Sequence, residues 1–152
     1  MPARRDADRL FLFAMRFGET ARLWRIQIDR RLRPLGISFP QWITLIRLAR
    51  GGDGLVQKAL ARATGIDGPT MVGVLDRLVA AGLVERRVAA HDRRAKTVHL
   101  TPRGRAFLDE ADRELAVLRA TLLAGVPPAT VARCTRLLET IAERAEAMAD
   151  EP

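Results

Sequence analysis

The sequence predicts a mainly α-helical fold with one small β-hairpin. Three observations predict it: apolar residues recur at steps of three and four over most of the chain, two strand-like runs lie close together at 84–89 and 95–100, and Pro and Gly separate segments of helical length. The predicted order is four helices, two strands and two helices. Such few and closely spaced strands exclude a parallel sheet built from alternating strands and helices.

The first helical region covers residues 1–35, with Gly18 expected to bend or interrupt it and Pro34 near its end. Ser38 is the expected N-cap of a second helix that runs to about Arg50, before the GGDG breaker at 51–54. The apolar face of the first region consists of Leu10, Phe13, Ala14, Phe17, Ala21, Trp24, Ile28 and Leu32.

Two short helices, near 56–64 and 68–81, form a helix-turn-helix pattern. Ala61 provides the small side chain where the helices cross, and Gly65 provides the left-handed backbone of the turn. Asp67 caps the second helix and Pro69 stiffens its first turn. The residues expected to hold the pair together are Leu60, Ile66, Met71, Val74, Leu75 and Leu78. An ordinary helical hairpin can match this pattern by accident, so the segment alone does not establish DNA binding.

The outward face of the second helix would carry Pro69, Thr70, Gly73 and Arg77. Recognition helices enter the major groove by their N-terminal residues, so Pro69, Thr70 and Gly73 are expected nearest to base edges. Arg77 lies one turn further along the helix and is expected to contact a phosphate.

The hairpin that follows concentrates positive charge at its tip, HDRR at 91–94. Asp92 would orient an arginine through a charge-assisted hydrogen bond, which leaves Arg93 or Arg94 free to enter the minor groove. The alternative for this pair is an exposed ion pair of little consequence. Further phosphate contacts, or alternatively solvated edge-strand charges, are expected at Arg86, Arg87 and Lys96.

Thr101 and Pro102 open a longer helix to about Leu123, and a last helix spans roughly 130–149. The last helix has an apolar seam at helical spacing, which predicts a dimer interface made from both ends of the chain. The alternative is packing onto the first helix of the same chain. Cys134 lies in the seam and is expected to be a small buried residue without a redox role. The predicted interface comprises Phe13, Phe17, Val131, Cys134, Leu138, Ile141 and Met148.

Charge is divided unevenly along the chain, whose net charge is +8: residues 1–55 carry +6, residues 56–105 carry +6 and residues 106–152 carry −4. A basic middle favours a polyanion partner, and double-stranded DNA is the partner we expect. One cysteine and the lack of a secretory leader or membrane span favour the cytoplasm. The sequence shows no catalytic motif, no metal-ligand cluster and no cofactor motif, so we expect neither an enzyme nor a metalloprotein.

Three stretches resemble the MarR family of winged helix-turn-helix regulators, and most closely its SlyA branch. They are ARLWRIQIDRRLRPLGISFPQWITL at 21–45, QKALARATGIDGPTMVGVLDRLVAAGLVERR at 57–87 and HDRRAKTVHLTPRG at 91–104. The most specific part is Asp-x-Arg followed by a strand and Leu-Thr, here Asp92, Arg94, Leu100 and Thr101. The resemblance implies dimerisation helices at 1–35 and 106–152 around a winged DNA-binding domain at 36–105.

The resemblance further implies a homodimer that binds an AT-rich near-palindrome on the nucleoid, usually as a repressor. Relatives commonly bind small aromatic carboxylates or phenols, and the residues implied here are Arg16, Trp24, Trp42 and His99. The tryptophans are equally well explained as core residues. Gly73 departs from the many relatives that carry a basic or hydroxyl residue there. It weakens the expectation of sequence preference and keeps a non-specific architectural DNA-binding protein as the alternative.

Overall fold

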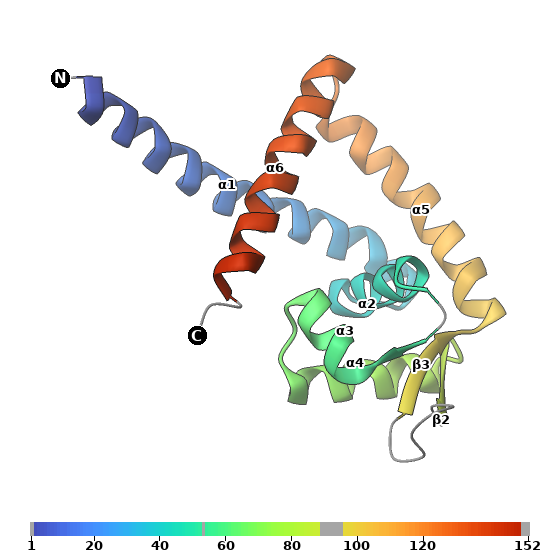
Figure 1. The fold of residues 1–152 in the computed structure, drawn as a ribbon. Coiled ribbons are helices and arrows are strands. Elements are labelled where there is room, and N and C mark those ends of the chain that lie inside the picture. Colours follow the sequence, from blue (N-terminus) through green and yellow to red (C-terminus); the bar gives the residue numbers. More distant parts are fainter. Residues whose placement is uncertain (1, 53, 89–95, 150–152) are drawn as a thin grey trace. The chain divides into compact units, whose positions relative to one another are not determined.

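A computed structural model of the chain describes residues 2–52, 54–88 and 96–149. Its internal contacts divide the chain into two compact units, residues 1–118 and 119–152. The first unit begins with a long helix, α1 (Pro2–Leu32), and a short 3₁₀ helix, η1 (Arg33–Leu35), which ends at Gly36 with a φ of 76° (Figure 1). Helix α1 continues through Gly18 without the interruption that the sequence allowed there. A single helical Gly costs only about 1 kcal/mol relative to Ala, which the rest of a long helix easily offsets.

The second helix, α2 (Phe39–Arg50), has the bounds that the sequence predicted. Its cap is confirmed at Ser38, whose backbone N–H donates to the Gln41 side-chain oxygen at 2.9 Å. Thr44 is fully buried on this helix, and its hydroxyl donates to the Pro40 carbonyl at 2.8 Å. Because that hydroxyl has an acceptor within the helix, its burial leaves no donor unpaired.

The predicted helix pair is confirmed as α3 (Gln57–Thr64) and α4 (Gly68–Ala80). Gly65 adopts a φ of 66° in the turn between them, a left-handed conformation that a side chain would strain. The residues expected to join the helices are buried in one continuous core, apart from Ile66, which is partly buried against it. The helix-turn-helix is therefore held by the apolar positions that its sequence pattern indicated.

The sheet has three antiparallel strands in the order β1 (Leu55–Val56), β3 (Lys96–Leu100), β2 (Val84–Val88). The pairing of β2 with β3 confirms the predicted hairpin, with Val84 opposite Leu100 and Val88 opposite Lys96. The third strand was not predicted, and Val56, expected at the start of a helix, lies in this strand instead. A two-residue strand has no periodicity to detect, and its pairing with residues 97 and 98 is long-range.

Helix α5 (Pro102–Leu122) follows β3 directly and crosses from the first unit into the second. The second unit consists of the end of α5, a turn in which Gly125 has a φ of 77°, and α6 (Pro128–Ala149). Its last helix begins at the second proline of the Pro127-Pro128 pair, close to the predicted start. Across the described residues, no helix is both long and apolar enough to span a membrane.

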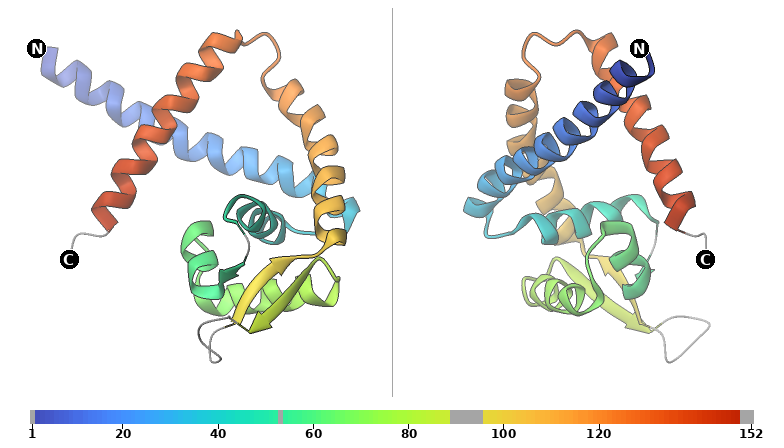
Figure 2. Two further views of the ribbon diagram at one scale, coloured as in Figure 1. Left: turned by 45° about the vertical axis from the view of Figure 1, so that its right-hand side comes forward. Right: turned by 90° about the vertical axis from the view of Figure 1, so that its left-hand side faces the viewer.

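The core of the first unit is formed by side chains from every helix in it and from the sheet. Helix α2 contacts α1, α3, α4 and β3, so it lies at the centre of this unit. In the views of Figure 2 the hairpin of β2 and β3 follows the end of α4 and lies beside it, with β2 against α4 and β3 against α2. This arrangement presents one face of α4 and the hairpin to solvent together.

Candidate nucleic-acid interface

The beginning of α4 is held by a complete N-cap at Asp67. The Thr70 backbone N–H donates to Asp67 Oδ1 at 2.9 Å, and the Thr70 hydroxyl donates to Oδ2 at 2.7 Å. These two hydrogen bonds, the backbone one first, hold the pKa of Asp67 below its usual value because they favour the charged carboxylate. The cap fixes the first turn of α4, where the base-reading residues of a recognition helix lie.

The outward face of α4 is accessible where the sequence analysis expected it. Pro69, Thr70 and Arg77 are exposed and Gly73 is partly exposed. A Cβ at Gly73 would have Arg77 Nη2 as its nearest neighbour, at 3.8 Å. The Arg77 side chain therefore leans back over Gly73, toward the N-terminal end of the helix. Because Gly73 has no side chain, the Arg77 guanidinium, from one turn further along the helix, has room above Gly73.

Two of the strand arginines have carboxylate partners within the chain. Arg86 Nη1 lies 2.8 Å from Asp76 Oδ1, which joins strand β2 to helix α4. Arg87 Nε donates to Glu85 Oε1 at 2.8 Å on the same strand. Lys96, at the start of β3, is exposed. The expected phosphate contacts of these residues stay a prediction, but the ion pairs partly offset the positive charge of Arg86 and Arg87.

The tip of the hairpin, which includes Asp92, Arg93 and Arg94, lies outside the described residues. Its base is held by Thr101, whose hydroxyl donates to the Gly82 carbonyl at 2.7 Å and accepts the Gly104 backbone N–H at 3.0 Å. The Thr101 backbone N–H also donates to the Leu83 carbonyl at 3.2 Å. One residue therefore joins the segment after α4, the end of β3 and the first turn of α5.

The four residues that the resemblance implied for a ligand site lie on three elements: Arg16 and Trp24 on α1, Trp42 on α2 and His99 on β3. Arg16 pairs with Glu19 on its own helix at 2.9 Å. Trp24 and Trp42 pack against the hydrophobic core, and Trp42 lies 5.7 Å from the Phe39 ring, centroid to centroid. His99 lines a small hollow of about 250 Å³ beside Gly54. The tryptophans thus lie where the core interpretation expected them.

The last helix leaves its apolar seam largely open to solvent. Leu138 and Met148 are 43% and 73% exposed, while Val131 and Ile141 are partly buried. Cys134 is exposed in the structure of the single chain, and its burial in a dimer interface stays a prediction. Among the described residues, no group of His, Cys, Asp or Glu could hold a metal ion.

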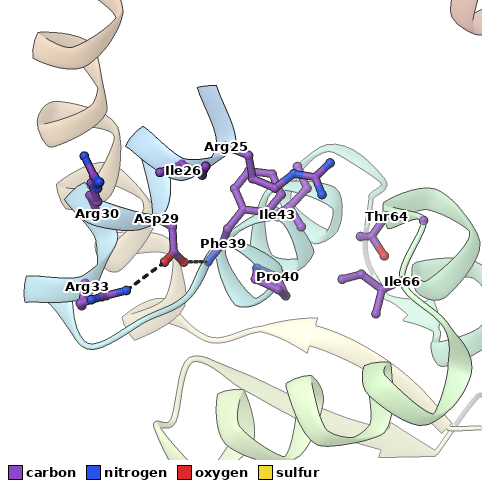
Figure 3. A pocket seen from close by; sticks show the side chains of 11 residues that line it. Arg25, Ile26, Asp29, Arg30, Arg33, Phe39, Pro40, Ile43, Thr64 and Ile66 are labelled. Atoms are coloured by element: carbon purple, nitrogen blue, oxygen red, sulfur yellow. Dashed lines mark hydrogen bonds and ion pairs between the residues drawn. The ribbon is translucent and has the colours of Figure 1, made fainter. Parts of the chain in front are cut away.

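Sequence reasoning missed two polar contacts between elements. One is the Asp76–Arg86 ion pair, and the other is the Asp29 carboxylate, which accepts the Phe39 backbone N–H at 3.0 Å and so joins α1 to α2 (Figure 3). The only signal in the sequence was the spacing of Arg25, Asp29 and Arg33, which places them on one face of a helix. That spacing does not identify a partner on another helix.

The comparisons with known proteins agree with this geometry. Residues 35–95 match a model of the MarR family. The structure is similar to that of the transcriptional regulator PA3341, with 37% identity, 89% of this chain and 98% of that chain covered, and a TM-score of 0.79. It is also similar to a MarR-family regulator from Rhodococcus sp. RHA1, with 25% identity, 90% and 94% covered, and a TM-score of 0.76.

A third similar structure is CouR from Rhodococcus jostii RHA1 bound to p-coumaroyl-CoA, with 25% identity, 86% of this chain and 91% of that chain covered, and a TM-score of 0.76.

Three findings lead to one assignment: the exposed recognition helix with its hairpin, the match to the family model, and the 37% identity over nearly the whole of a known regulator. The chain belongs to the MarR family of transcriptional regulators, which bind DNA through a winged helix-turn-helix and are not enzymes.

Proposed function

We propose that the chain works as a homodimer that binds an AT-rich, near-palindromic operator and represses neighbouring genes. The observation that carries this proposal is the exposed face of α4, capped at Asp67 and presented beside a basic hairpin. In a two-fold dimer, two such faces would read half-sites about 34–36 Å apart, one turn of the double helix. Its place of action would be the nucleoid in the cytoplasm. The motif at 91–104 supports a place in the SlyA branch.

Exposed apolar side chains at the beginning of α1 support self-association. Phe13 and Phe17 are 43% and 45% exposed, and their rings stack with centroids 6.3 Å apart. The same part of the helix exposes Leu10, Phe11, Leu12 and Met15. An apolar surface of this extent on a protein in water indicates an interaction site. A second copy of the chain would cover it, together with the open seam on α6.

We also propose that a small aromatic or phenolic ligand releases the operator. CouR, a relative at 25% identity, was solved bound to p-coumaroyl-CoA, whose acyl group is a phenol. The opposing hypothesis, a non-specific architectural DNA-binding protein, is favoured by Gly73, which offers no side chain to a base. Because phosphate contacts are independent of sequence, the two hypotheses differ in how binding responds to competitor DNA.

A titration of the purified protein with its own promoter region, with unrelated competitor duplex at rising salt, tests the proposal. Specific protection of one near-palindrome is expected to persist after non-specific binding is lost. Equal loss on all sequences would instead support the architectural hypothesis.

The hairpin at 84–100, called the wing below, has a separate test: Arg94→Glu at its tip should abolish operator binding. Arg113→Glu is the matched control, since it makes the same change of charge on the acidic C-terminal part of the chain. Operator affinity that survives Arg94→Glu unchanged would contradict the minor-groove role of this arginine.

A further inference from the structure

The exposed face of α4, beside the hairpin in Figure 2, has few side-chain donors to offer to a base. Pro69 and Val72 have apolar side chains, and Gly73 has none. The Thr70 hydroxyl donates its proton to Asp67 Oδ2 at 2.7 Å, as part of the N-cap. Thr70 can therefore accept a hydrogen bond from DNA, but it cannot donate one without opening the cap.

The two charged residues further along this face, Asp76 and Arg77, differ in their partners. Asp76 Oδ1 lies 2.8 Å from Arg86 Nη1, so strand β2 holds this carboxylate. Arg77 is exposed, and within residues 2–52, 54–88 and 96–149 no hydrogen bond or ion pair engages its guanidinium. The side-chain donors that the described part of this face offers to DNA therefore come from Arg77.

The position of the Arg77 guanidinium brings these donors toward the beginning of α4. A Cβ at Gly73 would lie 3.8 Å from Arg77 Nη2, so this nitrogen lies over residue 73. Long side chains on a helix point toward its N-terminus, and four residues of helix span about 6 Å along the axis. Because recognition helices contact bases with their N-terminal residues, this position places the guanidinium closer to the base edges than the Arg77 backbone is.

The chemistry of a guanidinium group favours guanine over the other bases. In the major groove guanine presents two acceptors, N7 and O6, whereas adenine presents the acceptor N7 beside a donor amino group. Parallel N–H groups of a guanidinium can donate to both guanine acceptors at once. On adenine, one of these N–H groups would meet another donor. A side chain longer than that of Ala at position 73 would compete for the space that the guanidinium uses.

We propose that Arg77 is a specificity-determining residue, whose guanidinium passes over Gly73 and donates to N7 and O6 of one guanine in each half-site. The inference rests on the proposed function, and it replaces the phosphate contact that was expected from the place of Arg77 along the helix. It also assigns a role to Gly73, since the base contact that position 73 lacks is supplied from residue 77. A fixed guanine in an AT-rich site would let the protein distinguish one AT-rich sequence from another.

Selection of binding sites from a randomised duplex pool tests the inference with the full-length protein. The wild type should select near-palindromes with a guanine at the same position of both half-sites, whereas Arg77→Gln should select sites without this preference. Anisotropy titrations then compare the selected duplex with one that carries 7-deazaguanine at this position and so lacks the N7 acceptor. The loss of N7 should weaken wild-type binding about 5-fold or more and leave the affinity of Arg77→Gln almost unchanged.

Variants at positions 73 and 113 provide the controls. Gly73→Ala leaves room for the guanidinium, so it should keep the guanine preference. Gly73→Leu should remove the preference although Arg77 is still present, because the longer side chain occupies the space over residue 73. Arg113→Gln makes the same change of charge on α5 and should leave the preference unchanged. Circular dichroism shows that each variant keeps its helices.

Several outcomes would overturn the assignment. They are a wild-type site without a fixed guanine, an Arg77→Gln protein that selects the wild-type guanine, or a Gly73→Leu protein that keeps the full penalty for 7-deazaguanine. An Arg77→Gln protein that loses affinity equally on all duplexes, with a salt slope smaller by about one, would show a phosphate contact instead. In each case the wild type still selects a site, so the proposed function stands. A wild-type protein that selects no sequence from the pool would refute the proposed function itself.

Discussion

Gly104 and Gly73 are both glycines within helices, and the structure predicts opposite effects when each is changed to Ala. A Cβ at Gly104 would lie 2.1 Å from the Leu83 carbonyl oxygen and 3.1 Å from Leu100 Cδ2. A Cβ at Gly73 would have only Arg77 Nη2 nearby, at 3.8 Å. Neither glycine has a positive φ, so the difference between them is one of space, not of backbone conformation.

Gly104→Ala should lower the free energy of unfolding. Relieving a contact with a backbone carbonyl requires a shift between α5 and the end of α4, and overpacking of this kind costs about 1–3 kcal/mol. The same shift would weaken the hydrogen bond from Thr101 N to Leu83 O, 3.2 Å long, at a cost of about 1 kcal/mol. The better helix propensity of Ala returns about 1 kcal/mol. The expected net loss is about 1–3 kcal/mol.

Gly73→Ala should instead raise the free energy of unfolding by about 0.5–1 kcal/mol, since Ala fits without contact and favours the helix. Urea denaturation followed by circular dichroism, at equal protein concentrations, measures both changes. The two variants should differ by about 1.5–4 kcal/mol, which is large against a typical stability of about 5–15 kcal/mol. A Gly104→Ala protein as stable as the wild type would refute the close approach of α5 to Leu83.

Three further predictions concern charge and assembly. Because the pKa of Asp67 is lowered in the folded protein, its carboxylate stabilises the fold above the usual carboxyl pKa, and this stabilisation is lost as pH falls through the folded pKa. Asp67→Asn keeps a capping residue but removes the titrating group, so it should reduce the loss of stability between pH 5 and pH 3 in urea titrations. Asp76→Arg should weaken operator binding in anisotropy titrations, and the double exchange Asp76→Arg with Arg86→Asp should restore part of the lost affinity. If the double exchange restores no affinity, the ion pair does not position the wing. If the proposed dimer forms through the beginning of α1, Phe17→Glu should give monomers in light scattering where the wild type gives a dimer mass. A dimer mass that Phe17→Glu leaves unchanged would exclude the beginning of α1 from the interface.

Local signals in the sequence predicted the helices and their ends because each depends on neighbouring residues. Ser38, Asp67 and Thr101 cap helices as expected, since a cap joins a side chain to backbone groups two or three residues away. Gly65 was recognisable because the turn requires a positive φ. These local features were enough to predict most of the helices and the position of the recognition helix.

Contacts between elements distant in the sequence could not be predicted in the same way. Strand β1 pairs with residues 97 and 98, and Arg86 pairs with Asp76 on another element. Neither contact produces a periodic pattern of residues in the sequence from which it could be predicted. The direction of the Arg77 side chain over Gly73 is likewise seen only in the structure, since the sequence shows the spacing of the two residues but not the rotamer of Arg77. The predicted ligand residues came from the resemblance, not from the packing of this particular chain.

Thr101 gives the regulator a direct mechanical link. Because Thr101 connects β3 to α5 in the chain, and its hydroxyl also bonds to Gly82 and Gly104, the base of the hairpin is held to the first turn of α5. A tilt of α5 would therefore be passed to the base of the hairpin through both the backbone and the hydroxyl of Thr101. We expect a movement of α5 to weaken operator binding while every base-reading side chain stays chemically unchanged.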